Sequence, residues 1–384
     1  MEQNNTYPHV NWTDGMKLNK DAFIAQNNAH TFDLYNLISS TLSPIRYGVL
    51  PVEDGFNVQI NTDNQNTLRV NVLSCKAITI GGAYININAT EPNSHTDANP
   101  SISISLPGSV NEAHWVVLTL NPFDRMPFGN INPQENPPRF PFVKPGYSVQ
   151  LIAHHQLNQY AQNPYSLFIG KLVPAGGYLQ VDAEYMPPCL SVNASQDLLG
   201  LHAELDSFMA NLEQACAQIV QKIYKKSQQN DLAELAQFVC DRLMLYISKA
   251  LTDFRWLYIY DSPAKMISEI VGLARALKNT IDLRTGSGKE ELMNYLSEWS
   301  ELKQGELETL LNNMAVLRYN HNDINENVNS IIQFAKVIGK LFNTLSSLEF
   351  IGKKKESGIF VKEGYINDSG ENSNAPKPKR RFFG

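Results

Sequence analysis

The sequence predicts an α+β multidomain protein, in which an N-terminal antiparallel β-sandwich is followed by an α-helical bundle or coiled coil. Between Tyr47 and about Tyr185, apolar and polar residues alternate, which is the period of a half-buried β-strand. After Ser195, apolar residues recur every three or four positions, which is the period of an amphipathic helix. Pro187 and Pro188 separate the two regions, because proline lacks a backbone donor and suits a connector. A sandwich domain, a helical domain and a tail are therefore expected at residues 1–186, 187–350 and 351–384.

The composition favours a folded protein with substantial cores. Of the 384 residues, 43% are hydrophobic, and the net charge of -6 does not indicate nucleic-acid binding. No apolar run reaches the roughly 18 residues of a membrane-spanning helix. The N-terminus, MEQNNTYPHVNW, has no basic or apolar signal-peptide region, so we expect none. The four cysteines lie far apart and are expected to be reduced thiols of a cytoplasmic protein: Cys75, Cys189, Cys216 and Cys240.

The first expected element is a helix that is capped by Asn19 or Asp21. Its apolar residues have helical spacing: Phe23, Phe32, Leu34, Leu37 and Ile38. The segment VNWTDGM, which precedes the helix, contains a turn at Asp14-Gly15. The sequence therefore predicts a turn followed by a helix before the first strand.

About eight strands follow, separated by turn signals. They lie in the segments FNVQIN, LRVNVL, AITIGGAYININ, SISISL, WVVLTLN, YSVQLIAHHQL and YSLFIGKLV. Such a series of strands is typical of an antiparallel sandwich or barrel, and the sandwich is the fold that we expect. Residues 121–146 are rich in proline, and a long loop inside a compact domain is usually functional or mobile. We interpret this stretch as a projecting or wrapping arm.

Long helices are expected after the two prolines. The first begins at Ser195 or Asp197, the second at Asp231 and the third at Pro263, and the turn RTGSG precedes a fourth. The last begins at Asp323, which forms a D-x-x-E capping pattern with Glu326. The first helix carries a heptad seam that predicts a coiled-coil-like partner, and hence contacts between chains, at Leu198, Leu201, Leu205, Phe208, Leu212, Ala215 and Ile219.

Motifs that could carry chemistry are weak. GSGK at residues 286–289 lacks the first glycine and the Ser/Thr of a phosphate-binding loop, so we favour a helix–helix turn. His154 and His155 are adjacent in a predicted strand, where neighbouring side chains point to opposite faces and cannot share a metal ion. His321 and Asp323 are more simply a helix entry than an acid–base pair. We therefore expect no catalytic residues, no cofactor and no metal site.

The last residues include KPKRR followed by two phenylalanines. Basic and aromatic residues at a chain end suit an acidic groove, a nucleic acid or a membrane surface, although a solubilising tail is equally compatible with them. The candidate contact residues in this tail are Lys379, Arg380, Arg381, Phe382 and Phe383. A short strand at residues 359–365 is also compatible with the pattern.

Four stretches resemble the TssK family, the baseplate subunits of bacterial type VI secretion systems. VNWTDGMKLNKDAF resembles the opening pattern of the family, and RYGVLPVE resembles the Tyr-Gly strand that follows its first helix. EYMPPCLSVNASQDL is similar to the Pro-Pro junction and first neck helix, and YNHNDINENV is similar to the entry of the last neck helix. Together the stretches extend from residue 9 to the last neck helix, which ends near residue 350.

This resemblance implies a β-sandwich "shoulder", a helical "neck" and a homotrimer formed around the neck, as in related phage tail-like contractile injection systems. It also implies a non-catalytic adaptor in the cytoplasm, recruited to the inner-membrane face, that binds the wedge proteins TssF and TssG. The residues that match the opening pattern and become candidate partner contacts are Trp12, Gly15, Met16 and Phe23.

The sequence departs from the family pattern after Phe350, where we expect no head domain. The head normally binds the membrane-complex proteins TssL and TssM, so the membrane-side partner is of unknown identity. A headless variant is expected in the type VI systems of Bacteroidota. We hypothesise that the tail replaces the head as the membrane-side contact.

Two other classes of function are compatible with the sequence. A phage-tail receptor-binding or baseplate protein would read carbohydrate with its sandwich. A carbohydrate-active enzyme would need two carboxylates about 5 to 10 Å apart in a cleft. Most acidic residues of the β region lie in predicted turns, which disfavours the enzyme: Glu53, Asp54, Asp63, Glu91, Asp97, Glu112, Asp124, Glu135 and Asp182.

Overall fold

The computed structural model describes residues 6–63, 66–88, 100–106, 111–161, 163–300, 302–303 and 305–352. These residues form two compact units, divided between Ala194 and Ser195, and Asn320–Asn325 belong to the first unit. The first unit thus contains residues 187–194, which the sequence predicted to belong with the helices. None of the helices among the described residues is long and apolar enough to cross a membrane.

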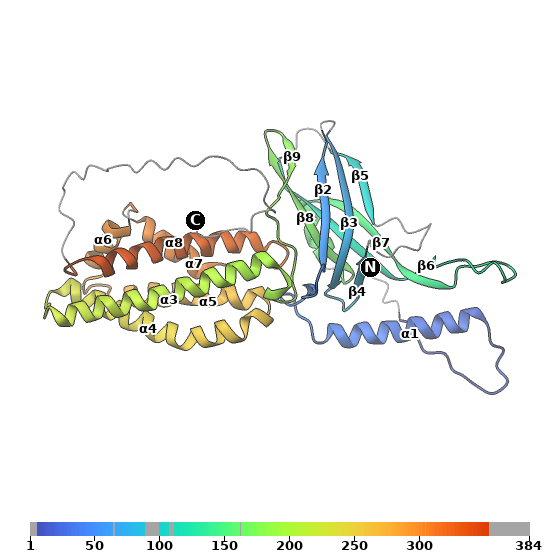
Figure 1. The fold of residues 1–384 in the computed structure, drawn as a ribbon, viewed down its shortest axis with the longest axis horizontal. Helices are drawn as coiled ribbons and strands as arrows, with labels where there is room; N and C mark the ends of the chain where they lie inside the picture. Colours follow the sequence, from blue (N-terminus) through green and yellow to red (C-terminus); the bar gives the residue numbers. More distant parts are fainter. Residues whose placement is uncertain are drawn as a thin grey trace. The chain divides into compact units, whose positions relative to one another are not determined.

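Two antiparallel sheets form the body of the first unit (Figure 1). One contains β1 (Gly48–Val49), β2 (Phe56–Thr62), β3 (Thr67–Ile78), β4 (Tyr84–Asn88) and β5 (Ser101–Ser105). The other has the order β7-β6-β8-β9 and contains β6 (His114–Phe128), β7 (Phe142–Ala153), β8 (Ser166–Ala175) and β9 (Tyr178–Val181). Buried residues of both sheets, such as Val70 and Leu118, share one core. The predicted antiparallel β-sandwich is therefore confirmed.

Two local predictions in the second sheet are wrong. Residues 121–146 are a loop only over 129–141, because β6 and β7 continue on either side as a two-stranded ribbon in which Met126 pairs with Lys144 and Phe128 with Phe142. Whether this stretch serves as an arm stays a prediction. Prolines are tolerated there because each strand of a two-stranded ribbon has an outer edge that pairs with no further strand, so a missing backbone N–H on that edge breaks no hydrogen bond. The predicted strand YSVQLIAHHQL ends at Ala153, and His154–Gln156 form a 3₁₀ turn that leads into α2 (Leu157–Ala161).

The helix predicted before the first strand is α1 (Lys20–Ser39). Asn19 caps it, since its side-chain oxygen accepts a hydrogen bond from the Ala22 amide at 2.8 Å. The C-terminal half of α1 packs on the turn between β3 and β4. A Cβ added to Gly82 there would lie 2.3 Å from the Tyr35 carbonyl oxygen, so only glycine allows this close approach.

The second unit is helical (Figure 1). Its helices are α3 (Gln196–Lys225), α4 (Asp231–Trp256), α5 (Pro263–Asp282), α6 (Lys289–Ser300), α7 (Glu306–Val316) and most of α8 (Ile324–Ser347). Ser195 caps α3 through the Leu198 amide, and Pro263 occupies the first turn of α5, as the sequence predicted. The predicted order of a sandwich followed by helices is thus confirmed.

The heptad seam of α3 is buried within a single chain. Its residues are at most 7% exposed: Leu198, Leu201, Leu205, Phe208, Leu212, Ala215 and Ile219. Phe208, for example, contacts Phe334 of α8 with ring centroids 6.3 Å apart. Heptad spacing also serves burial against helices of the same chain, so a role of these residues in contacts between chains stays a prediction.

The segment with Pro187 and Pro188, between the sandwich and the helices, is hydrogen-bonded to β1 and is not a free connector. The Val49 amide donates to the Pro188 carbonyl at 2.8 Å, and the Leu190 amide donates to the Val49 carbonyl at 2.9 Å. Gly48 has φ of 112°, and an added Cβ there would lie 2.0 Å from the Pro188 oxygen. Cys189 is 1% exposed beside these contacts, and all four cysteines are buried thiols that form no disulfide.

Residues 320–325 return to the first unit and are fixed there by polar contacts. Asp323 forms a buried ion pair with Lys171 of β8. Asn322 accepts from the Tyr47 hydroxyl at 2.6 Å through its side chain and from the Tyr185 hydroxyl at 2.7 Å through its carbonyl. We call residues 320–325 the return segment. Its partners Tyr47, Lys171 and Tyr185 are distant in sequence, so the return segment connects the residues beside β1, strand β8 and the chain just before the two prolines.

His321 is a buried imidazole of the first unit. The imidazole is 4% exposed, and its Nε2 lies 2.9 Å from the Tyr47 carbonyl oxygen. Burial lowers the pKa of His321 from 6.5 to about 4, although the backbone hydrogen bond opposes this shift.

We expect the first unit to lose stability as the pH falls from 7 to 5. The unfolded imidazole binds a proton near pH 6.5, whereas the folded one does so only near pH 4, so acid favours unfolding through this window. The loss at pH 5 amounts to about 2 kcal/mol. Urea unfolding of the wild type and of His321→Gln at pH 7 and pH 5 measures this loss in the free energy of unfolding. An equal pH dependence in the two proteins would contradict the assignment.

Candidate partner-binding surface

The N-terminal segment, residues 6–18, lies antiparallel along α1. Trp12 contacts Phe23 with ring centroids 5.8 Å apart, and Tyr7 contacts Phe32 at 5.6 Å. Between these aromatic pairs, the Val10 amide donates to Gln26 Oε1 at 3.0 Å. The N-terminal segment and α1 therefore form one structural element.

The turn predicted at Asp14-Gly15 links the N-terminal segment to α1. The Met16 amide donates to the Thr13 carbonyl at 3.2 Å, and Gly15 has φ of 79°, a value that favours glycine. Gly15 is exposed and Met16 is half-buried. The structure thus brings Trp12 and Phe23 together, whereas Gly15 serves to turn the chain.

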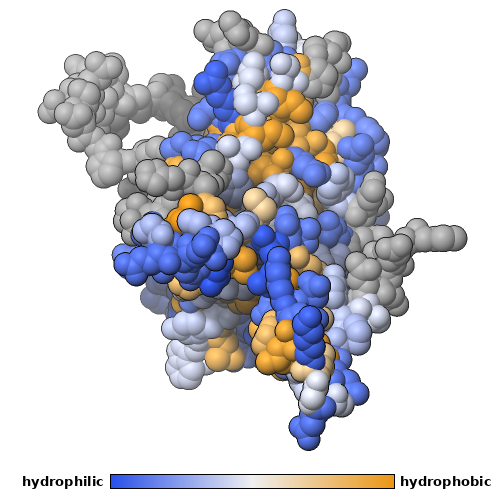
Figure 2. Space-filling view, turned by 90° about the vertical axis from the view of Figure 1, so that its right-hand side faces the viewer, coloured by the Kyte–Doolittle hydropathy of each residue, from blue (hydrophilic) through white to orange (hydrophobic). Residues whose placement is uncertain are grey.

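Large apolar side chains are exposed along α1. Only Ala22 and Ala29 of this helix are buried. We define the α1 surface by five side chains that are between 44% and 67% exposed: Trp12, Leu18, Phe23, Leu34 and Leu37. Since residues eleven and fourteen positions apart lie on nearly the same side of a helix, Leu34 and Leu37 continue the side that carries Phe23. Figure 2 shows apolar surface exposed between hydrophilic side chains on the side of the molecule turned towards the viewer.

A second exposed apolar region lies on the β6–β7 ribbon. Met126, Phe142 and Val143 are 47%, 61% and 43% exposed. Phe142 contacts Phe128 with ring centroids 5.7 Å apart, and the Lys144 ammonium lies 5.8 Å from the Phe128 centroid. Isolated two-stranded ribbons are marginally stable in water, so such a ribbon is suited to gaining contacts from a partner.

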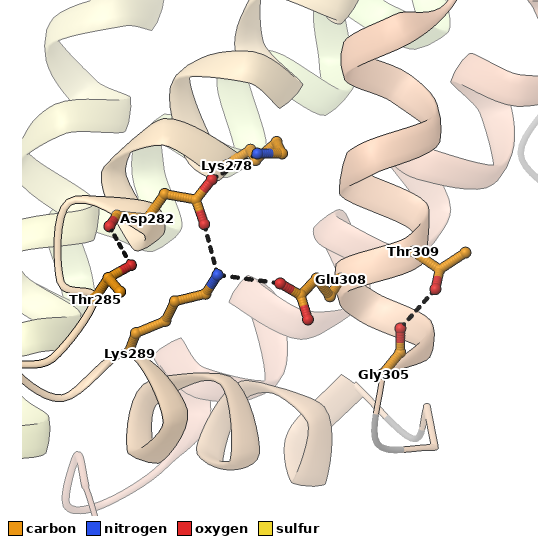
Figure 3. Close-up of polar contacts among 7 residues, drawn as sticks. All are labelled: Lys278, Asp282, Thr285, Lys289, Gly305, Glu308 and Thr309. Atoms are coloured by element: carbon orange, nitrogen blue, oxygen red, sulfur yellow. Dashed lines mark hydrogen bonds and ion pairs between the residues drawn. The ribbon is translucent and has the colours of Figure 1, made fainter.

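The GSGK segment is a helix–helix turn, as the sequence favoured. Figure 3 shows that the Lys289 ammonium contacts two carboxylates, Asp282 at 2.7 Å and Glu308 at 3.1 Å. Hydrogen bonds from Lys278 and Lys289 lower the pKa of Asp282, so its negative charge stays paired with both lysines. Lys289 is therefore committed to the packing of α5, α6 and α7 and does not extend towards a phosphate.

The paired histidines have separate partners. His154 packs on Trp115 with ring centroids 5.4 Å apart, and His155 Nδ1 lies 3.0 Å from Glu112 Oε1. Within the part of the chain that the structure describes, no group of three or more His, Cys, Asp or Glu residues could hold a metal ion. His321 and Asp323 have the structural partners described above. The tail candidates Lys379 to Phe383 lie outside the described residues.

The sequence missed two functional candidates, the exposure of α1 and the apolar ribbon. For α1, the weak signal was its loose apolar spacing, which leaves no continuous stripe for a core. For the ribbon, the signal was that apolar residues at 126–128 and 142–143 stand on either side of a run of prolines. Neither signal distinguishes an exposed apolar side chain from a buried one.

Comparisons with known proteins find similarity among solved structures. No family model and no curated protein matches the chain. A crystal structure of TssK is 15% identical, with 89% of this chain and 70% of that chain covered and a TM-score of 0.46. TssK of the EAEC type VI secretion system bound to a nanobody is 18% identical, with 83% and 99% covered and a TM-score of 0.44. A chain of a type VI secretion baseplate complex is 18% identical, with 87% and 99% covered and a TM-score of 0.47. The first two of these solved structures are thus TssK, the family that the sequence motifs resemble.

Proposed function

We propose that this protein is a non-catalytic structural subunit of a type VI secretion baseplate. It acts as a trimeric adaptor in the cytoplasm and links the wedge proteins TssF and TssG to the membrane-side complex. The observation that carries the proposal is the exposed α1 surface, which is built from the stretch that resembles the opening pattern of the family. One solved structure that is similar to this chain is a TssK–TssF–TssG subcomplex, and we transfer these partners only as a proposal.

The α1 surface has the properties of a protein-binding site. Its side chains are aromatic or aliphatic, and polar residues of α1 such as Asn27 and Asp33 surround them. Exposed apolar patches with polar rims mark interaction sites, and aromatic residues dominate the binding energy of such sites. The α1 surface is therefore the region to which we assign the wedge contact.

Replacing Phe23 and Leu34 together with serine is expected to weaken wedge binding by about tenfold or more, because apolar anchors are lost from an interface. Both side chains are more than half exposed, so the fold should remain intact. Biolayer interferometry with purified wedge proteins measures the affinity. The matched control is Tyr178→Ser on β9, since Tyr178 is 60% exposed in the same unit. Wild-type affinity of the double variant would exclude the α1 surface as the wedge contact.

A homotrimer requires a surface of the single chain that is accessible to a neighbouring copy. A groove of about 460 Å³ lies between α3 and α8 in the second unit. Phe208 and Leu212 form part of its lining, together with the small residues Ala203, Ala335 and Gly339. Small residues allow helices of a neighbouring copy to approach closely. We assign the contact between copies to this groove.

Filling the groove with Ser207→Arg and Asn211→Arg is expected to change the mass in solution from three chains to one. Both residues are exposed, so two added cationic side chains obstruct a neighbouring copy without entering the core. Light scattering coupled to size-exclusion chromatography gives the mass. Thr252→Arg, at an exposed position of α4, is the control. A trimeric double variant would place the contact between copies elsewhere.

The tail remains the proposed membrane-side contact. Its candidate residues are Lys379, Arg380, Arg381, Phe382 and Phe383, which combine basic charge with aromatic surface. Such a combination favours acidic protein grooves as well as anionic membrane surfaces. Deletion of residues 366–384 is expected to abolish recovery of membrane proteins with the chain and to leave wedge binding unchanged.

A further inference from the structure

We propose that the N-terminal segment is held on α1 by a proton-sensitive clasp, in which the Gln26 carboxamide bridges the imidazoles of His9 and His30. The clasp is closed when both imidazoles are neutral and opens when they are protonated. It concerns the chain by itself and does not depend on the partner assigned to the α1 surface.

Hydrogen bonds determine the orientation of the Gln26 amide. Its Oε1 accepts from the Val10 amide at 3.0 Å, so its Nε2 faces the two histidines. Gln26 Nε2 lies 3.2 Å from His9 Nδ1 and 2.6 Å from His30 Nε2. An amide nitrogen carries two hydrogens and accepts none, so both imidazole nitrogens must act as acceptors.

Asp33 determines the tautomer of His9. His9 Nε2 lies 2.7 Å from Asp33 Oδ2 and therefore carries the proton, which leaves Nδ1 as the acceptor for Gln26. The resulting chain of hydrogen bonds runs from Val10 through Gln26 to His9 and Asp33, with a branch to His30. Every polar atom of the Gln26 side chain has a partner in this state.

Protonation removes both acceptors. A proton on His9 Nδ1 or His30 Nε2 would point at an amide hydrogen of Gln26, and two imidazolium rings with centroids 5.1 Å apart would repel each other. The ion pair of protonated His9 with Asp33 opposes opening. The stabilisation from this ion pair is small, because the His9 and Asp33 side chains are 50% and 59% exposed, and exposed ion pairs contribute little to stability.

Asp33 is the charged group in contact with the clasp among the described residues. The clasp lies on α1, and the nearby Tyr7 stacks on Phe123 of β6 with ring centroids 3.9 Å apart. The other charged residues near these contacts in sequence are Asp14, Lys17, Lys20, Asp21, Asp124 and Arg125. In the described structure none of these six forms an ion pair with His9 or His30, so Asp33 is the charged partner of the clasp.

The Val10 amide reports the state of the clasp, because it donates directly to Gln26. Hydrogen exchange of this amide, followed by NMR at pH 7.5 and pH 5.5 and corrected for the intrinsic rate, measures opening. We expect protection to fall roughly three- to tenfold on acidification, as for the loss of about one hydrogen bond. The amide of Val117 in β6 serves as the control for global unfolding, since Val117 is fully buried.

The Gln26→Glu variant tests the mechanism by reversing its sign. A carboxylate has no hydrogens to donate and accepts from protonated imidazoles, so protection of the Val10 amide should rise on acidification. Opposite pH responses in wild type and Gln26→Glu would support the clasp. Wild-type protection that is independent of pH, or a variant that responds in the same direction as wild type, would overturn it.

Discussion

Replacing Lys171 with methionine is expected to lower the free energy of unfolding of the first unit by about 3–5 kcal/mol. The Lys171 and Asp323 side chains are only 12% and 3% exposed, so the substitution leaves a carboxylate buried without its countercharge. The Lys171 ammonium also lies 5.2 Å from the centroid of the Trp115 ring, a contact that methionine would lose. The same change would release the return segment from β8.

Urea unfolding, followed by hydrogen exchange of the β6 and β8 amides, measures this loss. A double variant, Lys171→Met with Asp323→Leu, should recover much of the stability, because an apolar pair removes both charges from the interior. The control is Arg69→Met, since Arg69 is 71% exposed in its pair with Asp63 and should cost at most about 1 kcal/mol. If Lys171→Met costs no more than Arg69→Met, the buried pair does not hold the return segment.

Gly82→Ala is expected to cost about 2–4 kcal/mol and to detach the C-terminal half of α1 from the sandwich. Gly82 has φ of 80°, and an added Cβ would lie 2.3 Å from the Tyr35 carbonyl and 2.9 Å from the Ser39 nitrogen. These contacts involve backbone atoms, which cannot move away without shifting the helix. The backbone strain and the steric clash therefore add.

Gly15→Ala separates the two contributions. Gly15 has φ of 79°, and an added Cβ there would meet no atom within 4 Å. This variant should carry only the backbone strain, about 1 kcal/mol. Thermal unfolding gives both stabilities, and hydrogen exchange of the α1 amides shows detachment. Equal costs for the two variants would mean that the contact between Gly82 and α1 is unimportant.

The fold was predictable where local patterns decide the structure. The Asn19 and Ser195 caps follow from side chains that accept backbone hydrogen bonds at helix starts. The alternation in FNVQIN and LRVNVL places these segments in β2 and β3. Period and capping are properties of a few neighbouring residues, so one sequence suffices to reveal them.

The return segment shows what a sequence pattern cannot give. Asp323 and Lys171 are 152 positions apart, and the D-x-x-E pattern explains Asp323 equally well as a helix cap. The seam of α3 is ambiguous for a related reason. Its period specifies a buried stripe but not whether the burying helix belongs to the same chain or to another.

The candidate site was predictable only in part. The sequence singled out Trp12 and Phe23 through a family pattern, and the structure places them in contact. The loose apolar spacing of α1 did not single out Leu34 and Leu37 as exposed, because an apolar residue on a helix is ordinarily expected to face a core. Exposure depends on what packs against α1, which is a property of the whole fold.

Co-purification of the full chain from its native host, with identification of the captured proteins by mass spectrometry, tests the proposed function most directly. The proposal predicts that wedge proteins related to TssF and TssG are recovered together with membrane proteins. A chain that lacks residues 366–384 should retain the wedge proteins and lose the membrane proteins. Recovery of phage capsid or tail proteins, with no wedge proteins, would contradict the assignment to a secretion baseplate.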